Sequence, residues 1–175
     1  FNLYLITDRR RTCGRPLTTV VEEALKGGIK AVQLREKDLS AKELFKLAHG
    51  IRGLTRQYGA RLFINDRVDI ALAVGADGVH LGQKSFSAND VKQFLNNISH
   101  ITPHAYASRL LVGVSTHSLD EAKKAEGEGA DFITFGPIFY TPSKADYGKP
   151  LGVEAIKKMR KKINIPVFAI GGINK

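Results

Sequence analysis

Residues 31–66 read AVQLREKDLSAKELFKLAHGIRGLTRQYGARLFIND. They begin with a short apolar, β-branched run at 31–36 and end with another at 61–66. Between the two runs, Ser40 stands at a helix N-cap position and Glu43 stands three residues on, which is the capping-box spacing. The stretch is therefore predicted to be a β-α-β unit. Its two strands are expected to lie parallel in one sheet and to be joined by a right-handed crossover.

The same unit recurs along the whole chain. Strands are predicted at 3–8, 31–36, 61–66, 78–83, 111–116, 132–137 and 166–172, and helices at 18–26, 40–58, 68–74, 87–97, 118–127 and 152–162. Continuous apolar strands are typical of a parallel sheet that is covered on both faces. A unit length of about 25 to 30 residues fits a TIM barrel. The doubly wound alternative is disfavoured, because no glycine-rich phosphate turn follows the first strand.

The predicted fold is therefore an α/β, (β/α)₈ TIM barrel that forms one domain over residues 1–175. Only seven strands are found, so the eighth βα unit is absent from this chain. A seven-stranded barrel leaves unpaired strand edges, which predicts that the natural protein continues for a strand and a helix. Residues 96–109 form a long helix-to-strand connection and are expected to be a surface excursion. His100 and His104 could form a metal pair, but no third ligand is evident nearby, so a metal site is not expected there.

Composition excludes several classes of protein. The chain has 175 residues, 43% of them hydrophobic, and a single cysteine, Cys13. One cysteine excludes a disulfide framework and a cysteine zinc site, and Cys13 is expected to be an ordinary loop residue. No apolar run is long enough to span a bilayer. We therefore expect a cytoplasmic protein with no membrane partner.

The formal net charge of +10 raises the possibility of a nucleic-acid partner. The densest basic run, at 157–162, lies at the end of a predicted helix, where cations favour the helix dipole and face water. We therefore expect no nucleic acid. A phosphorylated small molecule would also benefit from a positive field, and a homo-oligomer is left open.

Reactive residues of such barrels lie at the carboxyl ends of the strands. Gln33, Arg35 and Lys37 alternate, so all three are predicted to face the barrel mouth, whereas Glu36 faces the helices. A guanidinium beside an ammonium suits a phosphate or diphosphate. A structural ion pair with inward carboxylates is the alternative.

Asn65 and Asp66 end the third strand. Together they could cap the following helix. With a diphosphate substrate, Asp66 instead becomes a ligand for Mg²⁺, which prefers oxygen.

Later strand ends add hydroxyls, a histidine and glycines. Thr141, Ser143 and Lys144 suit phosphate oxygens, although such residues also form ordinary turns. Gly171 and Gly172 would let backbone N–H groups approach an anion. At the end of the fifth strand, His117 is either an acid or base or a helix cap, whereas His80 is expected to pack in the core.

Six spaced motifs together resemble the thiamine phosphate synthase family. They are Gln33-Leu-Arg-Glu-Lys37, Asn65-Asp66, Ala76-Asp-Gly-Val-His-Leu-Gly-Gln83, Gly113-Val-Ser-Thr-His117, Phe135-Gly-Pro-Ile-Phe139 with Thr141-Pro-Ser-Lys144, and Ile170-Gly-Gly-Ile173. The resemblance implies a transferase that joins hydroxymethylpyrimidine diphosphate to thiazole phosphate. The products would be thiamine phosphate and pyrophosphate, and Mg²⁺ would be required.

The resemblance also implies residue roles. Catalytic roles fall to Ser115 near the reacting centre, to Lys144 and to His117. The substrate-binding residues would be Gln33, Arg35, Lys37, Asn65, Ser115, Thr141, Ser143, Lys144 and Gly172. Asp66 would bind Mg²⁺, and Ser85 stands where the family's second metal-binding aspartate is expected.

Ser85 leaves other functions open. Together with His117 it also resembles the related thiazole tautomerase branch, which acts on thiazole carboxylate phosphate by proton transfer. Lys37 and Asn65-Asp66 favour the synthase, because site chemistry rather than fold decides function. A non-catalytic barrel that binds a phosphate ligand is a further alternative.

Overall fold

The computed structural model describes residues 1–99, 109–142 and 149–173. Strands and helices alternate along the chain, and the α/β class predicted from the sequence is confirmed. The chain divides into two compact units, Phe1–His80 with Leu95–Leu111, and Leu81–Phe94 with Val112–Lys175. Each unit is described by itself.

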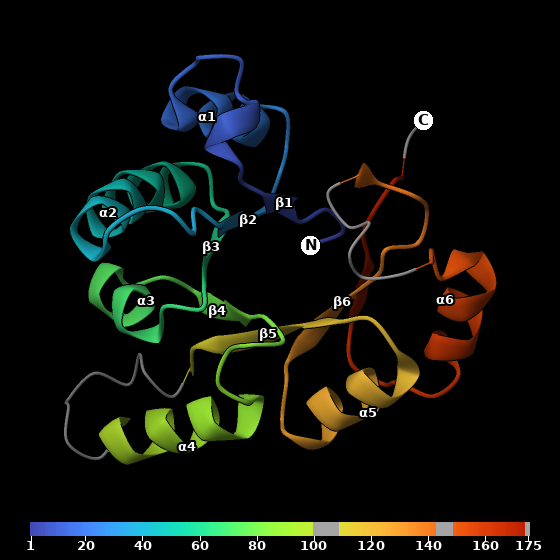
Figure 1. Cartoon of the computed structure of the whole chain (residues 1–175). Helices are drawn as coiled ribbons and strands as arrows, with labels where there is room; N and C mark the ends of the chain where they lie inside the picture. Colours follow the sequence, from blue (N-terminus) through green and yellow to red (C-terminus); the bar gives the residue numbers. More distant parts are fainter. Residues whose placement is uncertain (100–108, 143–148, 174–175) are drawn as a thin grey trace. The chain divides into compact units, whose positions relative to one another are not determined.

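The first unit holds parallel strands that pair in chain order. Its elements are β1 (Leu5–Ile6), the short 3-10 helix η1 (Arg9–Arg11), α1 (Leu17–Lys26), β2 (Ala31–Leu34), α2 (Ala41–Gln57), β3 (Arg61–Asn65), α3 (Val68–Val74) and β4 (Gly78–Leu81), the last residue of which belongs to the second unit. Helices α1, α2 and α3 lie on one side of these strands (Figure 1). Apolar side chains from the strands and helices meet there, and Val32, Leu62 and Ile51 have no exposed surface.

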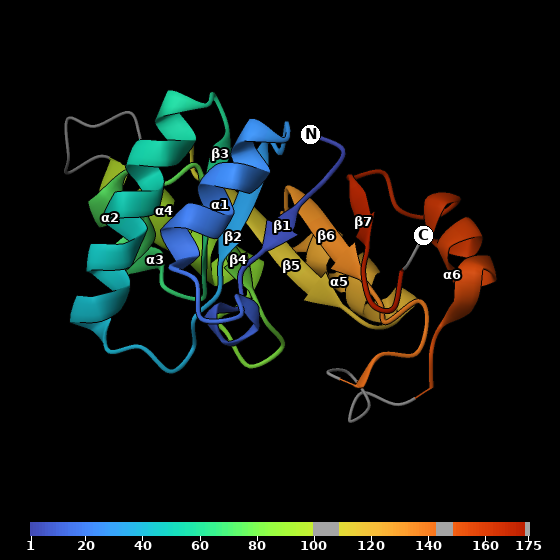
Figure 2. The ribbon, with the colours of Figure 1, turned by 90° about the horizontal axis from the view of Figure 1, so that it is seen from above.

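The second unit repeats the pattern. Its strands are β5 (Leu111–Thr116), which starts in the first unit, β6 (Phe132–Phe135) and β7 (Val167–Ala169), and its helices are α5 (Leu119–Gly127) and α6 (Gly152–Arg160). Strand β6 pairs in parallel with both β5 and β7. Helix α4 (Ala88–Ser99) begins in this unit. Strands β5, β6 and β7 lie next to one another when the molecule is seen from above (Figure 2).

Several predicted strands are too long at their carboxyl ends, and β2 is the instructive case. It ends at Leu34 and not at Glu36. Beyond Leu34 the next N–H finds a side chain in place of a backbone carbonyl: the Arg35 N–H donates to Oγ1 of Thr7, the residue that follows β1, at 3.0 Å. The residues beyond Leu34 therefore leave the sheet, and strand alternation no longer fixes where they point.

The capping-box prediction for Ser40 and Glu43 is confirmed. Ser40 and Glu43 form a complete capping box at the start of α2. Ser118 caps α5 by accepting from the Glu121 N–H. The Glu121 carboxylate, however, does not complete a box, because it accepts from the backbone N–H of His117.

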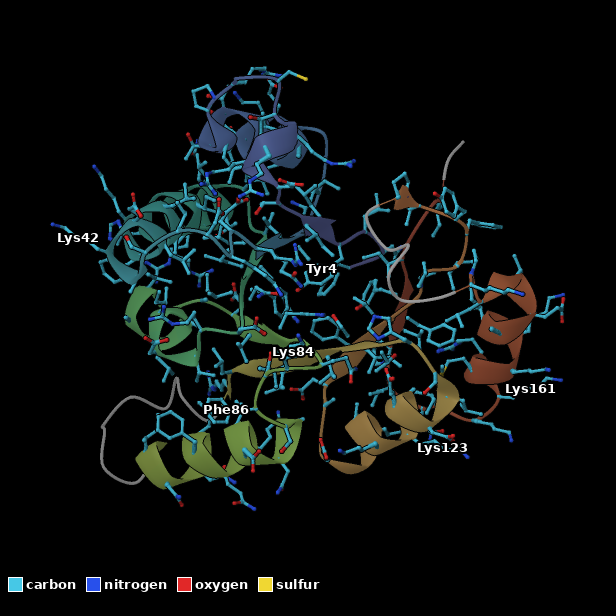
Figure 3. All side chains as sticks on the ribbon, in the orientation of Figure 1. Tyr4, Lys42, Lys84, Phe86, Lys123 and Lys161 are labelled. Carbon is cyan, nitrogen blue, oxygen red and sulfur yellow. The ribbon has the colours of Figure 1, made fainter. Side chains whose placement is uncertain are left out.

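Three of the four basic side chains labelled in Figure 3 project outward. Lys42 extends from α2, Lys123 from α5, and Lys161 follows α6. This fits the expectation that much of the positive charge faces water. Within the described ranges, no helix has both the length and the apolar character needed to cross a membrane.

Candidate functional site

A pocket of about 250 Å³ lies at the carboxyl ends of β2 and β3 in the first unit. Its lining consists of Leu34, Glu36, Lys37, Leu39, Leu44, Asn65, Asp66 and Arg67. The structure therefore brings together three of the predicted site residues, Lys37, Asn65 and Asp66. An ammonium and a carboxylate share one pocket, as an anion with an associated cation would require.

Lys37 lines this pocket from a turn and not from the strand on which it was predicted. It is exposed and lies in a turn beyond the end of β2, so the prediction that it alternates along the strand is wrong. Neither Lys37 nor the half-buried Arg35 makes a side-chain hydrogen bond or ion pair with any described residue. The alternative of a structural ion pair is therefore not what the described part of the chain shows.

Gln33 lies deeper. It is 1% exposed and is absent from the pocket lining. Its Nε2 donates to the Tyr4 hydroxyl at 3.1 Å, and that hydroxyl lies 3.4 Å from Nδ1 of His80. Burial raises the pKa of Tyr4 well above its ordinary value. His80 is 2% exposed, which confirms the interpretation of a core histidine.

Asn65 and Asp66 have an unusual backbone. Asp66 adopts the left-handed conformation with φ of 61°, which is uncommon for any residue other than glycine. Asn65 Nδ2 donates to Asp66 Oδ2 at 2.7 Å. The N-cap of α3 is Arg67, without a side-chain cap bond, so the capping alternative is wrong. Backbone strain of this kind is often found at functional sites.

Glu36 is a residue whose role the sequence analysis missed. It is 6% exposed and accepts from Thr7 Oγ1 at 2.7 Å and from the Arg9 backbone N–H at 3.1 and 3.2 Å. Its partners lie almost thirty residues away, so no local pattern points to them. The one available signal was an acid between two predicted phosphate-binding cations.

In the second unit, Glu121 connects the residues at the end of β5. Its Oε2 accepts from the His117 N–H at 2.7 Å and from Gln83 Nε2 at 3.0 Å, and it lies 3.3 Å from His117 Nδ1. Gln83 Nε2 also donates to the Ser115 carbonyl at 2.6 Å. Ser118 is the N-cap of α5, so the cap reading of His117 is wrong, and the imidazole lies beside a carboxylate.

Ser85 makes a local turn in the second unit. Its Oγ accepts from the Gly82 N–H at 2.8 Å, and its own N–H donates to the Gly82 carbonyl at 3.1 Å. Among residues 1–99, 109–142 and 149–173, no three His, Cys, Asp or Glu side chains cluster in a way that could hold a metal ion.

The loops after β6 and β7 lie against each other. The Phe139 N–H donates to the Gly171 carbonyl at 3.0 Å. Gly172 has φ of 64°, and a Cβ there would lie 2.5 Å from the Tyr140 carbonyl oxygen. Glycine is therefore required at this approach. Thr141 is partly exposed next to this contact.

Some predicted residues lie outside the described part of the chain. They are Ser143, Lys144, His100 and His104. Cys13 is exposed in a turn, in agreement with its expected place in a loop.

Comparisons with known proteins agree with the motifs. The family model described as thiamine monophosphate synthase matches residues 3–175. A putative thiamine-phosphate synthase of Geobacter sulfurreducens is 54% identical over 99% of this chain and 76% of its own length. A thiamine-phosphate synthase of Clostridium tetani is 44% identical over 98% of this chain and 77% of its own length.

Solved structures give the same result. The chain is similar to thiamine phosphate pyrophosphorylase from Pyrococcus furiosus, with a TM-score of 0.83 and 40% identity over 99% of this chain and 76% of that one. FabK from Thermotoga maritima, at 16% identity and a TM-score of 0.62, shares the fold alone. With a family match over nearly its whole length and relatives that are 54% and 44% identical, the chain belongs to the thiamine monophosphate synthase family.

Proposed function

We propose that this member of the family is a thiamine-phosphate synthase, a transferase that moves hydroxymethylpyrimidine from its diphosphate to thiazole phosphate. The observation that carries the proposal is the pocket of the first unit, where Lys37 and the strained Asp66 lie beside Asn65. The family membership and the names of the relatives support the same reaction.

The chemistry needs little from the protein beyond charge and position. The bond between the pyrimidine methylene and the diphosphate oxygen breaks, and its electron pair leaves with pyrophosphate. The thiazole nitrogen then attacks the methylene carbon. Lys37 and Arg35 are proposed to stabilise the charge that develops on the leaving group. Gln33, fixed by Tyr4, is proposed to orient the pyrimidine.

The residues present fit Mg²⁺ when the substrate supplies further oxygens. Magnesium is commonly held by one or two carboxylates together with substrate phosphates and water. Asp66, with a hard carboxylate in the pocket, is proposed as its protein ligand. Bound there, Mg²⁺ would add positive charge to the diphosphate. Ser85 is neutral and its Oγ already accepts from Gly82, so the proposed metal site depends on Asp66.

The second unit is proposed to serve the thiazole phosphate. Gly172, Thr141, Ser143 and Lys144 would bind its phosphate through N–H, hydroxyl and ammonium donors. Ser115 is proposed to lie near the reacting centre. His117, held by Glu121, is proposed to act as an acid or base in proton movement.

We also propose that the whole protein is a single (β/α)₈ barrel. Within the described ranges seven strands alternate with helices, and those whose pairing is given above run parallel to their neighbours. The TM-score of 0.83 with the Pyrococcus protein supports this proposal.

The decisive experiment measures thiamine phosphate formed from the two substrates, with and without Mg²⁺. Asp66→Asn keeps the shape and tolerates the left-handed backbone, so we expect loss of activity on the order of a hundredfold in a folded protein. Asp120→Asn is the matched control, because that carboxylate is exposed in the first turn of α5.

Three outcomes would change the assignment. An active Asp66→Asn variant would remove the metal role. Metal-independent conversion of thiazole carboxylate phosphate, lost in His117→Asn, would establish the tautomerase instead. Binding of both substrates without any product would establish a non-catalytic barrel.

A further inference from the structure

Lys37 lies in a turn whose neighbouring residues, Glu36 and Asp38, are both bound by other side chains. The turn spans Glu36 to Leu39, whose N–H donates to the Glu36 carbonyl at 3.4 Å. Lys37 and Asp38 occupy the two central positions of this turn. Lys37 is therefore flanked in sequence by two carboxylates, each of which could neutralise its ammonium.

Both flanking carboxylates are bound by one residue, Arg9. Its Nη1 lies 3.4 Å from Glu36 Oε2 and 2.5 Å from Asp38 Oδ1, and its Nη2 donates to Asp38 Oδ2 at 2.9 Å. The backbone N–H of Arg9 adds two further bonds to the Glu36 carboxylate. Arg10 also binds Asp38, at 2.7 Å. Hydrogen bonds and ion pairs thus link the short helix η1, which follows β1, to the turn that follows β2.

Glu36 and Asp38 are thus paired with arginines, Glu36 with Arg9 and Asp38 with Arg9 and Arg10. The Lys37 side chain has no partner among the described residues. The hydrogen bond from Arg9 holds the pKa of Asp38 below its usual range, so this carboxylate is ionised and stays paired at neutral pH. Planar guanidinium groups suit this task, because their several N–H donors can serve two carboxylates at once.

We infer that Arg9 is a positioning residue for diphosphate binding: it fixes the turn and keeps the Lys37 ammonium available to the leaving group. The inference rests on the proposed function and adds a residue that has no direct role in it. Without the Arg9 guanidinium, Glu36 would keep its bonds from the Thr7 hydroxyl and the backbone N–H of residue 9, and Asp38 would keep Arg10. Both carboxylates would nevertheless lose a cation that they share, and they would then be able to pair with the Lys37 ammonium and neutralise it.

The test uses pyrophosphate with Mg²⁺ as the probe, titrated calorimetrically into the purified full chain. We expect Arg9→Met to weaken pyrophosphate binding about tenfold. Arg11→Met is the matched control, since Arg11 lies in the same short helix but, among the residues that the structure describes, its side chain pairs with Asp8 alone, at 3.6 Å. It should stay within about twofold of the unmodified protein.

A double-mutant cycle separates positioning from general damage. If Arg9 acts through Lys37, Arg9→Met should add little in a Lys37→Ala background. Adding Asp38→Asn to Arg9→Met removes one competing carboxylate, so it should restore part of the lost affinity. In the synthase assay, KM for the pyrimidine diphosphate should rise, whereas KM for thiazole phosphate should stay unchanged.

The outcomes are distinguishable. Unchanged pyrophosphate affinity in Arg9→Met, or additive losses with Lys37→Ala, overturns the inference and leaves the synthase proposal intact. A failure of the unmodified protein to bind pyrophosphate overturns the proposed function itself. If Arg9→Met does not fold, Arg9→Lys retains one cation that cannot bridge both acids, and an unaltered affinity there is equally decisive.

Discussion

Each unit has an aspartate directly before a strand, Asp77 before β4 and Asp131 before β6. Each aspartate bonds to a helix side chain and to a backbone N–H of the preceding strand, so the stability effects of removing the two can be compared. Asp77 Oδ2 accepts from the Leu62 N–H at 2.8 Å and from Arg52 Nη1 at 2.5 Å. In the second unit, Asp131 Oδ2 accepts from the Val112 N–H and from Lys92 Nζ, both at 2.6 Å. Both aspartates follow a Gly-Ala pair.

The two sites differ in how the cation is solvated. The Arg52 side chain is 11% exposed, and its Nε has no hydrogen-bond partner among the described residues. The Lys92 side chain is 32% exposed. Removing the aspartate therefore leaves a mostly buried guanidinium at the first site, whereas the ammonium at the second can turn to water.

The expected losses of unfolding free energy follow from this difference. Each substitution to alanine removes a charge-assisted bond to a backbone N–H, worth about 1.5–3 kcal/mol. Asp77→Ala also leaves the Arg52 guanidinium buried without its carboxylate partner, which adds a desolvation penalty. Partial exposure of this pair reduces the penalty, so we expect a total loss of about 3–4 kcal/mol of unfolding free energy. For Asp131→Ala we expect about 2 kcal/mol.

The assay is urea unfolding followed by circular dichroism, with midpoints and slopes compared for both variants. Adding Arg52→Met to Asp77→Ala should recover part of the stability, because no buried charge then remains. Equal losses at the two sites, or no recovery in the double variant, would refute the reasoning. Synthase activity of the folded fraction should change little, since both aspartates precede their strands, at the ends opposite the proposed site.

Two further predictions concern single residues. Gly172→Ala should lower the melting temperature more than Gly59→Ala, because φ is positive at both positions but only at Gly172 would the new Cβ meet backbone atoms within 3 Å; the same variant should raise KM for thiazole phosphate. The bonds from Ser40 lower the pKa of Glu43, so this pair contributes stability that is present above the ordinary pKa of a glutamate and is lost as the pH falls through the lowered value. Ser40→Ala should therefore lower the urea midpoint at neutral pH, and the difference from the unmodified protein should shrink in acid; a difference that grew in acid would contradict the assignment.

Local signals predicted the helices and some strands well. The bounds of α3 and β5 agree with the sequence prediction. The capping box of α2 was found from two residues, because both of its bonds are made within four positions. Such elements are predictable because the groups that end them are close in sequence.

The carboxyl ends of the strands were less predictable. Residues such as Arg35 and Glu36 continue the alternating pattern, but a pattern cannot show that the hydroxyl of Thr7, just after β1, will accept from the next N–H. Lys37, expected on a strand, lies in a turn for this reason. The types of residue in the site were predicted from the sequence, whereas the backbone that carries them depends on contacts between distant segments.

The residues missed in both units are carboxylates, and the reason is physical. A site for a multiply charged anion needs cations, and cations in one place repel one another unless acids lie nearby. Those acids would neutralise the cations if they were not bound elsewhere. In this chain Glu36 is bound by the Arg9 N–H and Glu121 by the His117 N–H. A backbone N–H binds a carboxylate at any residue type, so nothing in the sequence distinguishes such an acid from one that pairs with the cation beside it.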